Sequence, residues 1–160
     1  MSLDSDIALL RGIPLFSELP TEQLRLLAFS AVRLELVADQ VLFREGTKAA
    51  SGFVVSSGGL QLTVGAEPDK HVVATCEIGS LIGEMALFVE TKRPATATAA
   101  AASQVLEIER KVILRMLNEY PHLALRMRAT LAERLNLTVT ELARVRQVLV
   151  NLDRHPARRS

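Results

Sequence analysis

The chain has 160 residues, of which 49% are apolar and 23% charged, and its 19 Lys and Arg against 18 Asp and Glu leave a net charge of +1. A chain of this length buries roughly 70% of its unfolded surface in one domain, which excludes an intrinsically disordered protein. The small net charge provides no strong field for nucleic acids or anionic membranes, so neither is an expected partner.

The cellular compartment is inferred from the cysteine content and the N-terminus. Cys76 is the single cysteine and cannot form an intramolecular disulfide, so we expect a reducing cytoplasm. The first residues include Asp4 and Asp6 rather than the basic residues of a signal peptide. No apolar run approaches the roughly 20 residues that a membrane span needs. These features predict a cytoplasmic protein.

Residues 3–31 are expected to form short helices. Leucines and isoleucines recur there at helical spacing, and Pro14 and Pro20 interrupt the pattern. Thr21 directly follows the second proline and is a predicted N-cap.

From residue 32 the apolar period changes, and short apolar runs alternate with glycine and proline. Such runs predict strands. Residues 95–102 include six alanines, which favour a helix by propensity. This segment lies between Pro94 and an apolar alternation that begins at Val105, so we predict a strand. Residues 32–109 are therefore expected to form an antiparallel β-roll of the jelly-roll type, also called a double-stranded β-helix.

The remaining residues predict helices. Residues 111–152 contain no glycine, and Pro121 fits the first turn of a second helix. The predicted fold class is α+β, with short N-terminal helices, a β-roll and a long C-terminal helix in one domain over residues 1–152. Residues 153–160 are a basic tail that we predict to be disordered.

The predicted C-terminal helix carries an apolar seam at heptad spacing. The seam consists of Leu135, Thr138, Leu142, Val145, Leu149 and Leu152. A helix over residues 121–152 is about 48 Å long, more than a small roll can cover. The seam either folds back on its own roll or pairs with a second copy, and we favour a parallel two-helix homodimer. Thr138, its polar member, is either a register device or a ligand contact.

Catalytic motifs are not found. His71, His122 and His155 are dispersed, without the spacing of metal ligands, so we expect no metal site. Neither a nucleophile elbow nor a phosphate-binding loop of the nucleotide hydrolases is present. The sequence therefore predicts a protein that is not an enzyme.

Residues 79–96 contain the groups that an anion site requires. Gly83 allows the backbone to approach a ligand, and a short helix that begins near Glu84 presents backbone N–H groups. Arg93 supplies a permanently charged fork, and Glu84 an acceptor for a hydroxyl. These features predict a site for a phosphate that carries a sugar. The alternative is that Glu84 and Arg93 form an ion pair on a surface loop.

The same segment resembles the phosphate-binding cassette of cyclic nucleotide-binding domains, which occur in bacterial transcription activators, kinase regulatory subunits and gated channels. The resemblance rests on residues 83–87 (GEMAL) and 93–96 (RPAT). It extends to residues 13–19 (IPLFSEL), 41–46 (VLFREG) and 53–58 (FVVSSG) and covers nearly the whole chain.

The resemblance implies roles for individual residues. It implies that Glu84 accepts from the ribose 2′-hydroxyl, that Gly83 lies close to the sugar, and that Arg93 binds the cyclic phosphate. Backbone N–H groups around Met85 and Ala86 are expected to complete the phosphate contacts.

Other positions carry weaker expectations from the same resemblance. Val73 and Ala74 are expected to line the base pocket, and Thr138 to contact the base. Pro94 departs from the family pattern, because proline offers neither an N–H nor a hydroxyl to the phosphate, although Ala95 follows the pattern. The missing hydroxyl favours cAMP over cGMP as the ligand, and no further cofactor is expected.

We therefore expect a cyclic nucleotide sensor that signals by moving its C-terminal helix. The alternatives are the sensor fragment of a transcription regulator whose DNA-binding domain is missing, and the regulatory domain of an enzyme or channel.

Overall fold

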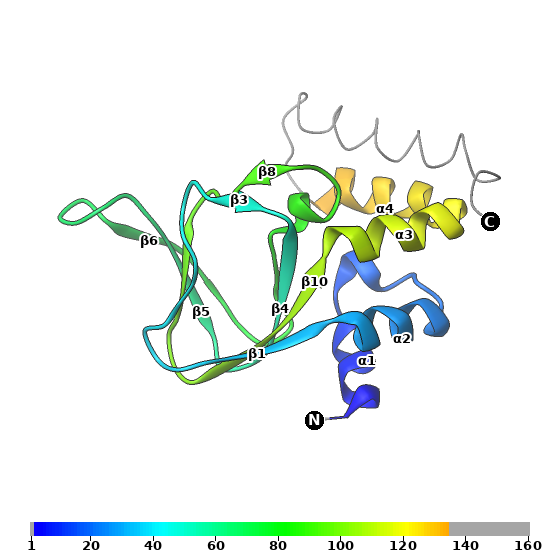
Figure 1. The fold of residues 1–160 in the computed structure, drawn as a ribbon, viewed down its shortest axis with the longest axis horizontal. Coiled ribbons are helices and arrows are strands. Elements are labelled where there is room, and N and C mark those ends of the chain that lie inside the picture. The colour runs from blue at the N-terminus through cyan, green and yellow to red at the C-terminus, as the bar shows by residue number, and fades with distance from the viewer. Residues whose placement is uncertain (1, 135–160) are drawn as a thin grey trace.

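The computed structural model describes residues 2–134, in which helices flank a β-roll (Figure 1). The N-terminal helices are α1 (Leu3–Arg11), the 3-10 helix η1 (Pro14–Phe16) and α2 (Thr21–Ser30). Helices α3 (Arg110–Glu119) and α4 (Pro121–Arg134) follow the roll. The predicted heptad seam with Thr138, the end of the predicted C-terminal helix and the basic tail lie outside the described residues.

The roll over residues 32–109 is built from antiparallel strands. They are β1 (Val32–Leu36), β2 (Val41–Phe43), β3 (Lys48–Ala49), β4 (Ser51–Ser57), β5 (Leu60–Val64), β6 (His71–Cys76), β7 (Leu81–Ile82), β8 (Thr91–Lys92), β9 (Thr96–Ala99) and β10 (Ser103–Glu109). One sheet has the order β1-β10-β4-β7, a second has the order β2-β9-β5-β6, and β3 pairs with β8. The predicted fold class is therefore confirmed.

Two apolar cores lie on opposite faces of the first sheet. Val54 of β4 and Leu106 of β10 pack against the helices, whereas their neighbours Val55 and Val105 pack inside the roll. This separation follows from the period of two in a strand, which sends successive side chains to opposite faces. The helices therefore cover the outer face of the sheet and leave the interior of the roll to a separate set of side chains (Figure 1).

The alanine-rich segment forms a strand, as predicted. Ala97 and Ala99 of β9 are 0% and 1% exposed inside the roll, where the second sheet leaves room for small side chains. The predicted N-cap at Thr21 is wrong, because Thr21 is the first helical residue of α2 and Pro20 is the cap. The Thr21 hydroxyl instead accepts from Arg11 Nη2 at 2.7 Å, and this contact joins α2 to α1.

Within residues 2–134, none of the helices is both long and apolar enough to span a membrane. The same part of the chain holds no group of three or more His, Cys, Asp or Glu side chains placed to bind a metal ion.

Candidate functional site

A tight turn connects β7 to the short 3-10 helix η2 (Glu84–Leu87) and places Gly83 at the mouth of the roll. Strand β7 pairs with β4 through Phe53 and Ile82. Gly83 then adopts φ 84°, ψ 37°, in the left-handed region that residues with a Cβ rarely adopt. Ala86 and Leu87 of η2 are buried and hold the turn in place. Because Gly83 has no Cβ, its backbone can approach a ligand closely.

The backbone of Arg93 is fixed by the turn that follows β2. Its N–H donates to Thr47 O at 2.8 Å, and its carbonyl accepts from the Gly46 N–H at 2.8 Å. Strands β3 and β8 pair directly before this point, through Lys48 and Lys92. The backbone contacts therefore set the direction in which the arginine side chain leaves the connection between β8 and β9.

The guanidinium of Arg93 lies inside the roll beside two aromatic rings that pack on each other. The residue is 6% exposed, and its Cζ lies 4.4 Å from the ring centroid of Phe43 and 5.2 Å from that of Phe53. Nη2 donates to Ser51 Oγ at 3.4 Å, whereas Nη1 has no hydrogen-bond partner among residues 2–134. A buried guanidinium nitrogen without a partner can donate a hydrogen bond to an acceptor atom of a ligand.

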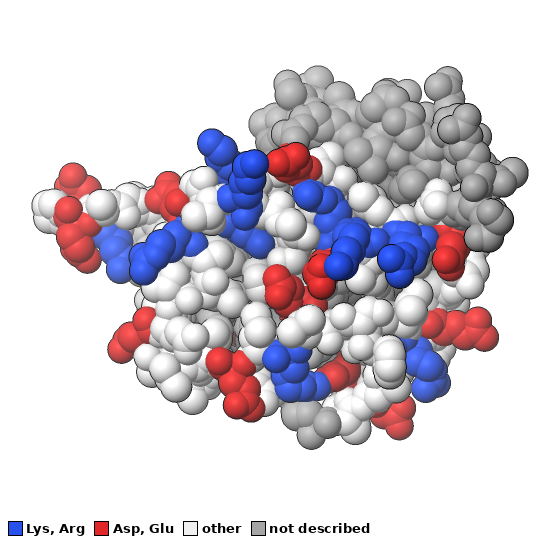
Figure 2. Space-filling model, in the orientation of Figure 1, with Lys and Arg blue, Asp and Glu red and all other residues white. Residues whose placement is uncertain are grey.

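The charge of this arginine is incompletely balanced by the protein. Desolvation by burial lowers the pKa of Arg93, and the negative charge of Glu107 opposes this by raising the pKa. Glu107 Oε2 accepts from Ser51 Oγ at 2.7 Å, so one serine hydroxyl links the two charged groups. By contrast, the basic side chains on the face shown in Figure 2 are mixed with acidic ones in solvent. Arg93 is therefore a buried cation able to receive an anion.

The backbone of Gly83 lies directly against the guanidinium of Arg93. A Cβ at Gly83 would lie 2.7 Å from Arg93 Nη1 and 3.2 Å from Ser51 O. Both distances are shorter than ordinary van der Waals contact. Any larger residue at position 83 would therefore have to displace the guanidinium, in addition to adopting an unfavourable backbone angle.

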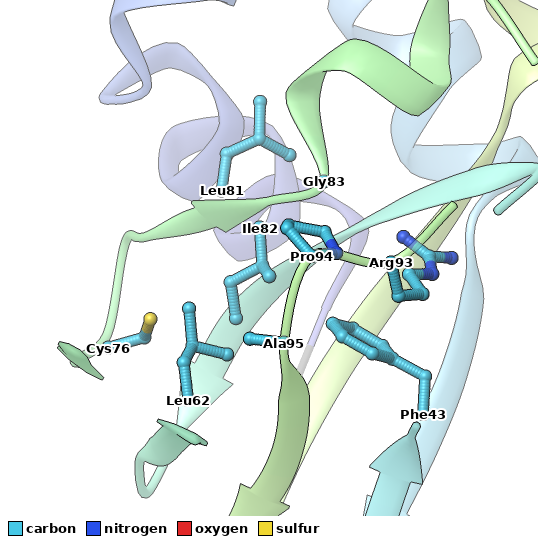
Figure 3. Close-up of a pocket in the computed structure, with 9 residues that line it drawn as sticks. All are labelled: Phe43, Leu62, Cys76, Leu81, Ile82, Gly83, Arg93, Pro94 and Ala95. Atoms are coloured by element: carbon cyan, nitrogen blue, oxygen red, sulfur yellow. The ribbon is translucent and has the colours of Figure 1, made fainter. Parts of the chain in front are cut away.

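These two residues open into a cavity of 190 Å³ at the mouth of the roll (Figure 3). The cavity is lined by Phe43, Leu62, Cys76, Leu81, Ile82, Gly83, Arg93, Pro94 and Ala95. Four predicted site residues, Gly83, Arg93, Pro94 and Ala95, thus lie in one cavity. The other lining residues are mostly apolar and suit an uncharged ring. The cavity therefore combines an apolar region with a single cation.

Glu84 lies beside this cavity but lines a different hollow. That hollow measures 300 Å³, and Ile13, Leu15 and Ser80 are among its other lining residues. Glu84 is half-buried and follows the glycine that borders the guanidinium. The alternative of an exposed ion pair on a surface loop is contradicted, because Arg93 is 6% exposed inside the roll.

The remaining predicted site residues that the structure describes do not line this cavity. Met85 packs against the helix-side core, Ala86 is 1% exposed, and the Ala86 N–H donates to Gly83 O at 3.1 Å within the turn. Ala74 lies opposite Leu62 on the edge strand β6 and so continues the face that lines the cavity. Val73 is 51% exposed at a shift in the β5–β6 register.

The sequence reasoning missed the aromatic and polar groups that hold the guanidinium. Phe43 and Phe53 lie in residues 41–46 and 53–58, which resemble the family, but the resemblance implied no role for them. Glu107 lies two residues after Val105 and therefore shares its face of the strand. A charged residue on the face of a buried valine is a signal for an interior carboxylate. Ser51 carried no signal of its own.

A family description and several relatives match this chain. The model for the cyclic nucleotide-binding domain matches residues 33–120. The cAMP-activated global transcriptional regulator CRP of Escherichia coli O157:H7 is 30% identical over 126 residues, which cover 72% of this chain and 60% of that protein. An uncharacterized NTE family protein of Mycobacterium tuberculosis is 31% identical over 126 residues, which cover 79% of this chain and 21% of that protein. The chain thus spans only part of the length of these relatives.

Solved structures agree with the family description. A cyclic nucleotide-binding-like protein from Brucella abortus has a TM-score of 0.67 and 37% identity, covering 72% of this chain and all of that chain. The N-terminal domain of a transcriptional regulator from Streptomyces coelicolor has a TM-score of 0.73 and 32% identity, covering 79% of this chain and 90% of that one. With the family match over more than half of its residues, the chain belongs to the cyclic nucleotide-binding domain family.

Proposed function

We propose that this domain is a sensor that binds a cyclic nucleotide, cAMP in preference to cGMP, at the cavity of Gly83 and Arg93. One observation carries the proposal: Arg93 lines this cavity, and its buried Nη1 has no hydrogen-bond partner among the described residues. A cyclic phosphate supplies the missing acceptor. Hydrogen bonds between charged groups contribute roughly 1.5 to 3 kcal/mol each, enough for micromolar affinity when several combine.

The apolar part of the cavity is proposed to hold the nucleoside. Leu62, Cys76 and Ile82 present apolar surface to the same cavity that Arg93 lines, on the other side of Pro94 and Ala95 from the guanidinium (Figure 3). The ribose is proposed to sit at Gly83, with Glu84 as the acceptor for its 2′-hydroxyl. Pro94 lines the cavity without a hydroxyl, which supports cAMP over cGMP, and the printed name of the CRP relative also refers to cAMP.

The direct test is calorimetry with cAMP, cGMP and 5′-AMP on the complete 160-residue chain. We expect micromolar or tighter affinity for cAMP, weaker affinity for cGMP and the weakest for 5′-AMP. A wild-type protein that binds 5′-AMP as well as it binds cAMP would reject the proposal.

Cys76 provides a second test, at the cavity itself. It is the single cysteine of the chain and lines the cavity, and burial raises the pKa of its thiol. The thiolate is the reactive form, so at pH 8 alkylation by iodoacetamide is expected to be slower than for an exposed cysteine and to accelerate at higher pH.

Saturating cAMP should slow the alkylation of Cys76 further, by about tenfold, because the base would cover the sulfur. Mass spectrometry of the single adduct measures the rate. An alkylation rate that cAMP leaves unchanged would place the nucleotide elsewhere.

Signal output is proposed to pass through the C-terminal helix and a homodimer. Support comes from the heptad seam in the sequence and from apolar side chains at the roll edge, where Val72 and Val73 are each 51% exposed. Sedimentation at tens of micromolar should give a species of twice the 17.5 kDa chain mass. Leu142→Asp should convert it to the monomer, and a wild-type monomer would contradict the dimer.

A second reading is favoured by the relatives. The matched segment covers 60% of the CRP protein and 21% of the mycobacterial one. We propose as the alternative that this domain serves as the sensor of a longer regulator or enzyme. The intact mass of the protein from its native source separates the two, since the alternative requires a mass well above 17.5 kDa.

A further inference from the structure

The carboxylate of Glu107 lies on the interior side of β10, close to the proposed phosphate-binding guanidinium. Glu107 pairs with Phe53 in the antiparallel register, and Val105 packs with Phe53 inside the roll. Residues two apart on one strand, and residues directly opposite on the next, share a face of the sheet. Glu107 therefore faces the side on which Arg93 stacks against Phe53.

A single hydroxyl connects the two charges. Ser51 is 4% exposed, donates to Glu107 Oε2 at 2.7 Å and accepts from Arg93 Nη2 at 3.4 Å. The second of these bonds is long, so the contact leaves the guanidinium only partly engaged. Its Nη1 still lacks a partner among the described residues. The site therefore combines the Arg93 cation, whose Nη1 is unpartnered, with the Glu107 carboxylate, which is linked to it through the Ser51 hydroxyl.

We infer that Glu107 is a charge filter, which, given the proposed function, reduces the preference of this site for doubly charged phosphomonoesters over singly charged phosphodiesters. Arg93 attracts both kinds of anion, whereas Glu107 repels them. A phosphomonoester carries a charge of about −1.5 to −2 at pH 7, against −1 for a diester. Both forces increase with ligand charge, and burial limits screening by salt.

The filter predicts a response that depends on ligand charge. Repulsion by one fixed charge is proportional to the ligand charge, so the logarithm of its effect on affinity doubles from a monoanion to a dianion. Removing the charge of Glu107 should therefore tighten binding about threefold for monoanions and about tenfold for dianions. A purely structural role for Glu107 would change both affinities by one common factor.

The test compares wild type with Glu107→Gln. The new amide oxygen can still accept from Ser51, so the variant removes the charge and keeps the hydrogen bond. Glu35→Gln is the matched control, because Glu35 is exposed and accepts from Gln104 Nε2 at 3.0 Å elsewhere in the same sheet. Affinities for cAMP and 5′-AMP are measured by calorimetry. Dimethyl phosphate and methyl phosphate are titrated by their effect on the melting temperature.

The expected result is that the charge preference, measured as the ratio of dianion to monoanion affinity, rises about threefold in Glu107→Gln and stays unchanged in Glu35→Gln. An unchanged preference in Glu107→Gln overturns the filter, even where cAMP binds and the proposed function stands. If the two small phosphates follow the expected pattern and cAMP does not bind, the filter stands and the proposed function falls. If none of the four anions binds to wild type, both are rejected.

Discussion

Replacing Arg93 by methionine is expected to abolish cAMP binding and, at the same time, to stabilise the ligand-free domain. The loss of binding follows from the loss of the charged fork, which should weaken affinity at least about a hundredfold, since each charged hydrogen bond contributes roughly 1.5 to 3 kcal/mol. The gain in stability follows from the 6% exposure of Arg93 and from Nη1, which has no partner among residues 2–134.

The sign of the change in stability depends on whether the cost of burying the Arg93 charge exceeds the stabilisation from its contacts. Leaving a buried polar group unsatisfied costs about 1–3 kcal/mol, and a buried charge costs more. The attraction of Glu107 and the stacking on Phe43 and Phe53 offset part of this, the stacking by about 0.5–2 kcal/mol. Methionine keeps an unbranched chain and a sulfur that packs well on aromatic rings, so little packing is lost. We expect a net gain of about 1 kcal/mol, or about 2–4 °C in melting temperature.

Thermal and urea unfolding without ligand measure this change, and calorimetry measures binding. Lys92→Ala is the matched control, since it removes the same charge one residue away at an exposed position. It should leave both stability and affinity nearly unchanged. A less stable Arg93→Met would mean that the rings, Ser51 and the charge of Glu107 together stabilise the guanidinium without a ligand.

This expected exchange of stability for binding is typical of sites that are built for a ligand. Ligand binding supplies the missing acceptor, so saturating cAMP should raise the stability of wild type above that of the methionine variant.

The architecture could be predicted from the sequence because it depends on local periodicity. Alternating apolar residues, glycine turns and Pro121 gave the order of helices and strands. The strand at residues 96–99 required one non-local argument, because six alanines favour a helix until the flanking Pro94 and the alternation from Val105 are considered.

The groups that contact the Arg93 guanidinium could not be predicted from local periodicity. Phe43 and Phe53 lie 50 and 40 residues before Arg93, and they meet it only because three strands converge at the mouth of the roll. Such convergence depends on cross-strand register, which apolar alternation does not specify. Glu84 illustrates the same limit, since the motif places it beside Gly83, yet it lines the neighbouring hollow.

Replacing Gly83 by alanine is expected to weaken cAMP binding at least about tenfold, through displacement of the guanidinium. Two effects combine at this position. The backbone angle φ of 84° costs a non-glycine residue roughly 1–2 kcal/mol. In addition, the new Cβ would lie 2.7 Å from Arg93 Nη1, so the guanidinium must move from its place in the cavity.

Gly46→Ala separates these two effects. Gly46 has φ 85°, and a Cβ there would meet no atom within 4 Å. It therefore carries the same backbone cost without the contact. Both variants should lose a similar roughly 1–2 kcal/mol of stability, because at Gly83 the closest atom is the end of a side chain.

Affinity should then distinguish the two glycines. Alanine at position 46 keeps the backbone N–H that donates to Arg93 O, so Gly46→Ala is expected to bind cAMP nearly as well as wild type when measured well below its melting temperature. Gly83→Ala is expected to bind more weakly. Equal affinities for the two variants would mean that the guanidinium tolerates displacement and that its position at Gly83 does not determine binding. A selective loss in Gly83→Ala would show that this glycine serves chiefly to leave space for Nη1, the atom on which the proposed phosphate contact depends.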